Sequence, residues 1–264
     1  MGIETQMELD KPIIGMQMYS LRDQAEIDLL GTLEEVAKIG YKAVELTGFF
    51  NVPAKELRSK LNQLGLAAPS AHISLHFNDM QNLLPRFVAQ LEYAKEAEID
   101  FIITPWVPLP EEPAMEDVKH LVDVLTKCAE KAQEMGMKYG FHNHEDEFKL
   151  IEGKTVLDHL MQQVPKELMT LELNLGWVHM AGYEPEVYIH KYKDRITMIH
   201  ARDFDHGRKD TEIGRGKVGY DKLIQTADSA GIRYIFAEQE QFAVSSFESA
   251  QNNYDYFRKL GYVQ

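Results

Sequence analysis

Short apolar segments alternate with longer amphipathic segments along almost the whole chain. The short segments predict strands, at residues 13–20, 43–47, 67–74, 101–106, 138–144, 169–175, 196–203 and 234–239. The longer segments predict helices, at residues 32–39, 53–64, 81–98, 114–135, 155–164, 185–192, 220–230 and 246–260. Strand and helix therefore follow each other in about eight repeated units.

Local signals support several of these helix boundaries. Thr32 and Glu35 have the spacing of a capping box, and Gly40 follows as a stop signal. Pro53 stands at the start of the next predicted helix, and Gly65 stands just past its end. These signals separate the second predicted strand from the helices on either side.

Strict alternation of strands and helices predicts parallel strands joined by right-handed crossovers. About eight units in roughly 250 residues match a closed (β/α)8 TIM barrel of the α/β class. A doubly wound open sheet is the alternative, but no G-x-G-x-x-G phosphate loop follows the first strand. We expect one domain, with residues 1–12 as an N-terminal extension and residues 13–264 as the barrel. The proline-bearing segment 105–113 is expected to be a loop at a strand end.

Composition narrows the class of protein. The chain of 264 residues has a formal net charge of −14, with 44% hydrophobic and 27% charged residues. These proportions are those of an ordinary globular protein. The negative charge disfavours nucleic acid as a partner, and no apolar run approaches the ~20 residues that cross a bilayer. The single cysteine, Cys128, cannot form an internal disulfide, and residues 1–11 lack the order of a signal peptide. We therefore expect a cytoplasmic protein with no membrane partner.

Polar side chains gather at the ends of the later predicted strands, which is where a barrel has its active site. His142 and His144 alternate along the fifth strand and so share one face. His200 ends the seventh strand, and Glu238 ends the eighth after a buried run. An unpartnered carboxylate would be costly to bury there, which favours Glu238 as a ligand or an acid/base group. Imidazoles and carboxylates from successive strand ends can together bind a divalent ion.

Other residues at strand ends have two interpretations each. Glu45 and Glu172 either line the pocket or are structural polar groups. His72 either contacts a sugar hydroxyl or is a hydrogen-bonded core histidine. Tyr19 and Trp106 either stack on a sugar face or are buried.

Three stretches at these strand ends resemble the sugar phosphate isomerase/epimerase superfamily, the xylose isomerase-like TIM barrels. They are residues 141–148 (FHNHEDEF), 200–203 (HARD) and 238–239 (EQ), and segments 14–23 and 40–46 extend the resemblance to nearly the whole chain. The superfamily includes ketose 3-epimerases, inosose dehydratases and endonuclease IV. The resemblance therefore implies a TIM barrel that acts on a sugar.

The resemblance also implies a metal site whose ligands are His142, Asn174, His200 and Glu238. His200 and Glu238 match a histidine and a glutamate of the family. His142 stands where the family has a glutamate, and Asn174 stands where it has an aspartate. Because the amide of Asn174 is neutral, we expect partial occupancy and a preference for zinc over manganese or magnesium.

The epimerase-like mechanism that the resemblance implies gives roles to the catalytic residues, and the substrate-binding residues are expected from their places near strand ends and in the loops that follow. Glu238 is expected to remove a proton next to a sugar carbonyl, and Glu147 or His144 is expected to return it. The residues expected to contact the substrate are His72, Trp106, Tyr19, Arg202 and Lys217. The alternative for Lys217 is a place in a solvated loop.

We therefore expect a sugar isomerase or epimerase that acts on a ketose or keto-sugar through an enediolate stabilised by a divalent metal ion. An inosose-type dehydratase or a 3-keto-glycoside β-eliminase is the alternative, because the same enediolate can expel a neighbouring oxygen. A non-catalytic sugar-binding barrel also stays open because of Asn174. An abasic-site endonuclease needs a basic groove, which the charge of −14 disfavours. The expected partners are a small-molecule sugar and further copies of this chain as a homo-oligomer, with no nucleic acid.

Overall fold

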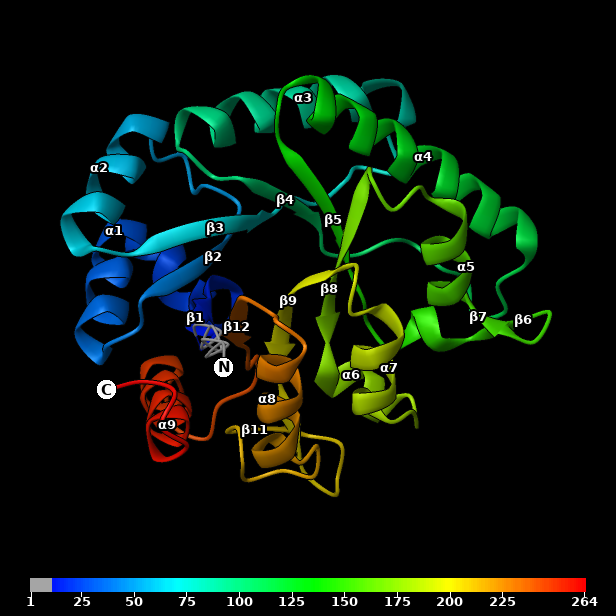
Figure 1. Ribbon diagram of the computed structural model, residues 1–264. Coiled ribbons are helices and arrows are strands. Elements are labelled where there is room, and N and C mark those ends of the chain that lie inside the picture. The colour runs from blue at the N-terminus through cyan, green and yellow to red at the C-terminus, as the bar shows by residue number, and fades with distance from the viewer. Residues whose placement is uncertain (1–10) are drawn as a thin grey trace, which may run out of the picture.

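Eight parallel strands close into a barrel, in the order β1-β12-β9-β8-β5-β4-β3-β2 (Figure 1). The structure is a computed structural model and describes residues 11–264. The barrel strands are β1 (Ile13–Gln17), β2 (Ala43–Thr47), β3 (Ala67–His72), β4 (Phe101–Thr104), β5 (Lys138–His142), β8 (Met169–Asn174), β9 (Ile196–Ala201) and β12 (Tyr234–Ala237). The predicted TIM barrel is confirmed. Residues 1–10 of the expected N-terminal extension lie outside the described part of the chain.

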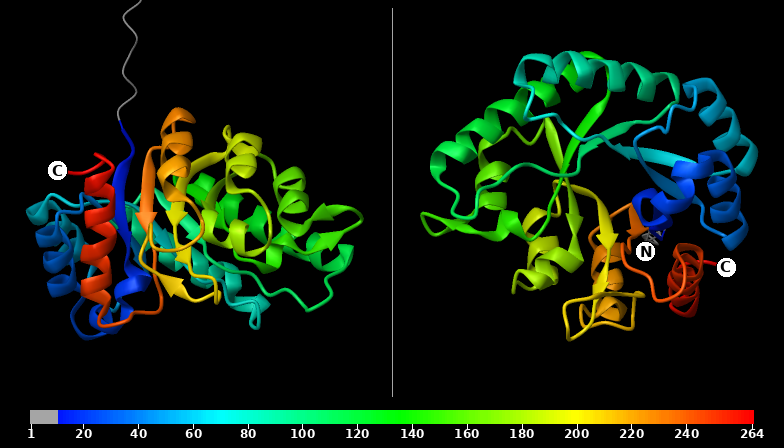
Figure 2. Two further views of the ribbon diagram at one scale, coloured as in Figure 1. Left: turned by 90° about the horizontal axis from the view of Figure 1, so that it is seen from below. Right: turned by 180° about the vertical axis from the view of Figure 1, so that it is seen from behind.

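Helices surround the barrel as an outer ring (Figure 1). They are α1 (Arg22–Ile39), α2 (Ala54–Leu64), α3 (Met80–Glu96), α4 (Met115–Glu134), α5 (Val156–Gln163), α6 (Leu175–Met180), α7 (Pro185–Tyr192), α8 (Tyr220–Ser229) and α9 (Ser246–Lys259). Helix α9 lies beside β1 (Figure 2), and Lys11 Nζ donates a hydrogen bond to the carbonyl of Gly261 at 3.0 Å. Among the described residues, no helix is both long and apolar enough to span a membrane.

Short elements interrupt the regular alternation. These are the 3₁₀ helices η1 (Met18–Leu21) and η2 (Asp146–Phe148), the hairpin of β6 (Leu150–Ile151) with β7 (Lys154–Thr155), and the hairpin of β10 (Asp203–Phe204) with β11 (Asp210–Thr211). Neither they nor the six-residue helix α6 were predicted. They follow strand ends, so they help to shape the active-site face of the barrel.

The first helix begins earlier than its sequence signals indicate. Its backbone leaves the helical conformation at Asp28, where φ is −153° and ψ is 94°. The Asp28 carboxylate accepts the backbone N–H of Gly31 at 2.9 Å, as the cap of a new helical segment does. Thr32 lies inside the helix and donates its hydroxyl to the Asp28 carbonyl at 2.7 Å. The capping box predicted at Thr32 is therefore wrong: the helical segment after the kink is capped by Asp28, and Thr32 already lies inside it.

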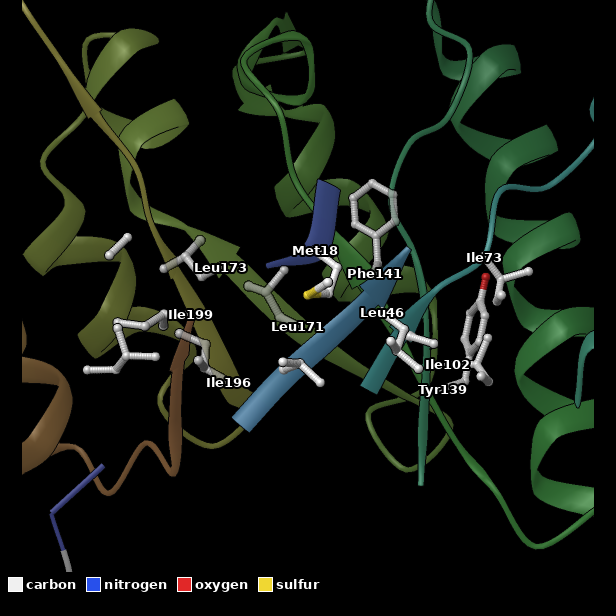
Figure 3. Packing of buried hydrophobic residues seen from close by; sticks show 14 of the residues in the cluster. Met18, Leu46, Ile73, Ile102, Tyr139, Phe141, Leu171, Leu173, Ile196 and Ile199 are labelled. Carbon is white, nitrogen blue, oxygen red and sulfur yellow. The ribbon is translucent and has the colours of Figure 1, made fainter. Parts of the chain in front are cut away.

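Two apolar layers hold the barrel. The outward side chains of the strands pack against the helices, as Leu46, Ile102 and Leu173 do in Figure 3. Inside the barrel, a smaller layer consists of Ala43, Ile103, Met198 and Phe236. This inner layer fills the lower part of the barrel, so the polar residues beyond it gather at the end where the strands terminate.

Candidate active site

Strand register places polar side chains of neighbouring strands side by side inside the barrel. Gln17 pairs with Glu45 across β1 and β2, and Glu45 pairs with Ser70 across β2 and β3. Both neighbours donate to the Glu45 carboxylate: Gln17 Nε2 to Oε2 at 2.6 Å, and Ser70 Oγ to Oε1 at 2.6 Å. Glu45 is fully buried, and these hydrogen bonds fix both of its oxygens.

A second buried carboxylate, Glu172, lies at the centre of three histidines. Its Oε1 is 2.6 Å from His72 Nε2, 2.9 Å from His142 Nδ1 and 3.0 Å from His200 Nε2. One possible ligand atom from each of the four residues lies within 4.8 Å of the others. We call these four residues the His/Glu cluster. Oε2 of Glu172 is buried without a hydrogen-bond partner among the described residues.

The carboxylates set the charge of the neighbouring histidines. Burial alone would lower the pKa of His72, but Glu45 and Glu172 outweigh it and raise that pKa to about 9. His200 likewise has its pKa raised well above the ordinary value, because the two carboxylates again outweigh burial. His142 has its pKa lowered by burial and by the neighbouring His200. At neutral pH the imidazolium cations of His72 and His200 therefore face the carboxylates of Glu45 and Glu172.

The donor set of the His/Glu cluster fits a divalent metal ion. Three imidazole nitrogens and one carboxylate oxygen are ligands that zinc accepts. The unpartnered Oε2 of Glu172 is a further buried lone-pair donor at the same place. His72 and His200 would have to give up their protons to bind a cation, so binding and proton release are coupled.

The predicted ligands divide between this cluster and its immediate neighbours. His142 and His200 belong to the cluster. Asn174 and Glu238 lie beside it: Glu238 Oε2 is 3.2 Å from His200 Nδ1 and accepts Asn174 Nδ2 at 2.6 Å. The amide oxygen of Asn174 accepts the backbone N–H of Trp177 at 3.1 Å and so caps α6. The expectation of four ligands that include Asn174 and Glu238 therefore stays a prediction.

A cavity of about 370 Å³ lies over the cluster, at the C-terminal ends of the strands. Its lining residues are Tyr19, Thr47, His72, Ser74, Pro105, Trp106, His142, His144, Trp177, Glu238 and Glu240. Tyr19 is 41% exposed and Trp106 is 52% exposed, so both aromatic rings reach solvent. We call this cavity the active-site pocket.

Several pocket residues outside the cluster have proton-transfer chemistry, among them His144, Glu238 and Glu240. Burial lowers the pKa of His144 to about 4, so its imidazole is neutral at physiological pH. Burial alone would raise the pKa of Glu238, but Arg202 and His200 outweigh it and keep the carboxylate ionised. His144 Nδ1 is buried without a partner in the described chain.

Glu147 lies behind the pocket wall. It is 1% exposed, and its Oε2 accepts the backbone N–H of His144 at 2.6 Å. Burial raises the pKa of Glu147 to about 7. Its position suits a residue that fixes the His144 loop, and it is absent from the pocket lining.

Arg202 and Lys217, two predicted substrate contacts, are also absent from that lining. The guanidinium of Arg202 is 4% exposed and binds Asp210 through Nε at 2.9 Å and Nη2 at 2.7 Å. Arg202 Nη1 also donates to Glu240 at 2.6 Å and lies 3.7 Å from Glu238. Lys217 is exposed on a loop, and its backbone N–H donates to the carbonyl of Phe204 at 2.9 Å.

Glu240, Gln17 and Ser70 belong to the site although the sequence pattern did not indicate them. Glu240 stands two residues after Glu238, and that spacing was the signal that could have placed both on one side of the chain. Gln17 and Ser70 lie at or near strand ends and could be recognised only through their register with Glu45.

The chain matches known proteins over most of its length. The family described as Xylose isomerase-like TIM barrel matches residues 33–260. An inosose dehydratase of Geobacillus kaustophilus (strain HTA426) is 31% identical over 191 residues, which cover 66% of this chain and 61% of that relative. The match thus spans less than two thirds of the relative's own length.

Solved structures share the fold at low sequence identity. A sugar phosphate isomerase/epimerase from Parabacteroides distasonis ATCC 8503 has a TM-score of 0.84 at 20% identity, over 96% of this chain and 100% of that chain. The IOLI protein, crystallised with a zinc atom, has a TM-score of 0.78 at 14% identity, over 94% of this chain and 97% of that chain. With its closed barrel, its strand-end pocket and the family match over 33–260, this chain belongs to the xylose isomerase-like TIM barrel family.

Proposed function

We propose that the protein removes the proton next to the carbonyl of a keto-sugar or keto-cyclitol and then eliminates water from it, as a lyase. The observation that carries this proposal is the shared position of Glu238 and His144 in a pocket directly over the His/Glu cluster. The inosose dehydratase with 31% identity supports elimination as the outcome.

Glu238 is our candidate for the base. Asn174 and His200 hold its Oε2, which fixes the carboxylate at the pocket wall. In the proposed reaction the carbon–hydrogen bond breaks and the proton moves to Glu238. The neighbouring carbon–oxygen bond then breaks, and the carboxyl returns the proton to the leaving hydroxyl, which departs as water.

The remaining pocket residues bind and orient the sugar. The neutral imidazole of His144 can accept a hydrogen bond from one hydroxyl, and Tyr19 and Trp106 offer ring faces to the sugar. When a divalent ion is bound by the His/Glu cluster, it supplies positive charge that stabilises a developing enediolate.

Isomerisation or epimerisation of a ketose is the second candidate. It begins with the same proton removal, but the proton is then returned to a carbon of the enediolate and no carbon–oxygen bond breaks. The two functions differ only in the fate of the enediolate, so one experiment can separate them.

The test incubates the purified protein, with its metal content measured, with a panel of inososes and ketoses in deuterium oxide. We expect an inosose to lose water to an unsaturated ketone, detected by ultraviolet absorbance and NMR. Glu238→Gln should abolish this, whereas Glu145→Gln, a change outside the pocket lining, should not. Deuterium incorporation without elimination would support an isomerase or epimerase instead. No incorporation and no product with any sugar would refute both.

A further inference from the structure

Glu240 lines the active-site pocket but has no part in the proposed reaction. It follows the end of β12, and its side chain is 29% exposed. Arg202 Nη1 donates to its Oε1 at 2.6 Å. Within residues 11–264, no group donates a hydrogen bond to its Oε2. One carboxylate oxygen is thus held by the protein, and the other is available to a ligand in the pocket.

A buried ion pair holds Glu240 in place. Nε and Nη2 of Arg202 donate to the two oxygens of Asp210 at 2.9 and 2.7 Å, and Nη1 of the same guanidinium binds Glu240. Asp210 Oδ2 also accepts the backbone N–H of Glu240 at 3.0 Å. Arg22 Nη2 donates to the Glu240 carbonyl at 3.1 Å. Both the backbone and the carboxylate of Glu240 are therefore fixed before a ligand binds.

The charge around Glu240 favours a ligand group that donates a hydrogen bond. Among the described residues that line the pocket, there is no lysine or arginine. The guanidinium of Arg202 lies behind the lining and is shared among Asp210, Glu240 and Glu238, which is 3.7 Å away. Its single positive charge faces three carboxylates, so an anionic group next to Oε2 of Glu240 would be repelled. A hydroxyl group can donate to this oxygen without adding a charge.

We propose that Glu240 determines specificity: its Oε2 accepts a hydrogen bond from one hydroxyl group of the ring bound in the active-site pocket. The inference rests on the proposed function only in taking the ligand to be a polyhydroxyl ring. No bond of the substrate forms or breaks at Glu240. A ring that lacks this hydroxyl would place a carbon–hydrogen bond against the carboxylate oxygen. We expect such a ring to bind about tenfold more weakly or worse, because a hydrogen bond to a charged group is lost.

The test measures the binding of unreactive cyclitols by calorimetry, at matched zinc content. The probes are myo-inositol and its monodeoxy derivatives, each of which lacks one hydroxyl group. We expect the wild type to bind at least one derivative about tenfold more weakly than myo-inositol. Glu240→Ala should bind myo-inositol about tenfold more weakly than the wild type does, and should lose the discrimination at one hydroxyl position only. Gln241→Ala, at the neighbouring exposed position outside the pocket lining, should match the wild type.

A general disturbance of the pocket would give a different pattern. If Glu240→Ala weakens myo-inositol and every derivative by the same factor, the residue acts through Arg202 and the inference is wrong. Glu240→Gln keeps the size of the side chain and guards against a folding defect in the alanine variant. Because it replaces a charged acceptor with a neutral amide, it should reduce the discrimination at that same hydroxyl alone.

Binding without turnover separates this inference from the proposed function. If no sugar reacts but the hydroxyl pattern is found, the proposed function fails and the role of Glu240 stands. If an inosose is dehydrated but Glu240→Ala binds every cyclitol as the wild type does, the proposed function stands and the inference fails. The inference also fails if the wild type binds myo-inositol no more tightly than any derivative.

Discussion

At the scale of the residue, the side-chain amide of Asn174 joins a helix end to a carboxylate. Its oxygen caps α6 through Trp177, and its Nδ2 donates to Glu238 at 2.6 Å. An aspartate here would keep the cap but would place a second carboxylate against Glu238. Two buried carboxylates at this distance repel each other unless a proton or a cation lies between them.

Asn174→Asp should therefore make stability depend on metal. Without metal we expect the free energy of unfolding to fall by roughly 2–4 kcal/mol, because a buried hydrogen bond becomes a repulsion. Added zinc should restore most of this loss. Urea unfolding with EDTA and with zinc measures both effects, and Asn78→Asp, at an exposed position, is the control. A variant as stable as the wild type in EDTA would contradict the contact between Asn174 and Glu238.

Some site residues could be placed from the sequence and others could not. His200 and Glu238 are polar residues at the ends of buried strands, a pattern that points to a pocket. Glu45 and Glu172 kept two interpretations, and each follows an irregularity in the pairing of its strand with the next. A shift of register changes the layer that a side chain occupies. Alternation along the sequence therefore could not say which of Glu172 and Asn174 lies at the centre of the three histidines.

At the scale of the element, the turn η2 controls where His144 stands. Glu147 in this turn reaches back to the backbone N–H of His144, and its carboxyl is buried. The catalytic role expected for Glu147 came from the resemblance to the family and not from a local pattern of residues. Elements of this length have no hydrophobic period, so neither η2 nor α6 could be predicted, whereas the long helices α3 and α4 were.

The buried carboxyl of Glu147 should make stability fall as pH rises. Its pKa is about 7 in the folded protein against an ordinary value of 4.5, so between these values the folded state holds a proton that the unfolded chain has released. Above this range, ionisation of the buried carboxyl lowers the free energy of unfolding by roughly 3 kcal/mol. The side chain of Glu147→Gln does not ionise. The Tm of this variant minus that of the wild type should therefore increase as pH rises from about 5 to about 8. Glu130→Gln, exposed on α4, is the control, and a difference in Tm that does not vary with pH would contradict the prediction.

At the scale of the whole molecule, strand–helix alternation was enough to predict the barrel. Short right-handed crossovers leave few other ways to arrange eight parallel strands. It could not reveal that the barrel interior divides into a small apolar layer and a charged one. The charged layer contains Glu45, Glu172 and three histidines, all buried. Burying so many ionisable groups is expensive unless they are paired. Here the histidines pair with the carboxylates, and a cation that replaces their protons and binds only the folded chain should stabilise the fold further.

Zinc should raise the Tm of the protein, and EDTA should reverse the change. A ligand at about 100 times its Kd stabilises the folded state by about 2.7 kcal/mol, which for a domain of this size corresponds to about 5–10 °C. The shift should grow with pH, because His72, with a pKa of about 9, and His200 must lose protons to bind the ion. Glu172→Gln should abolish the shift, and His120→Ala, at an exposed histidine on α4, should keep it. If zinc raises the Tm of Glu172→Gln as much as that of the wild type, the metal binds near Glu238 and not in the His/Glu cluster.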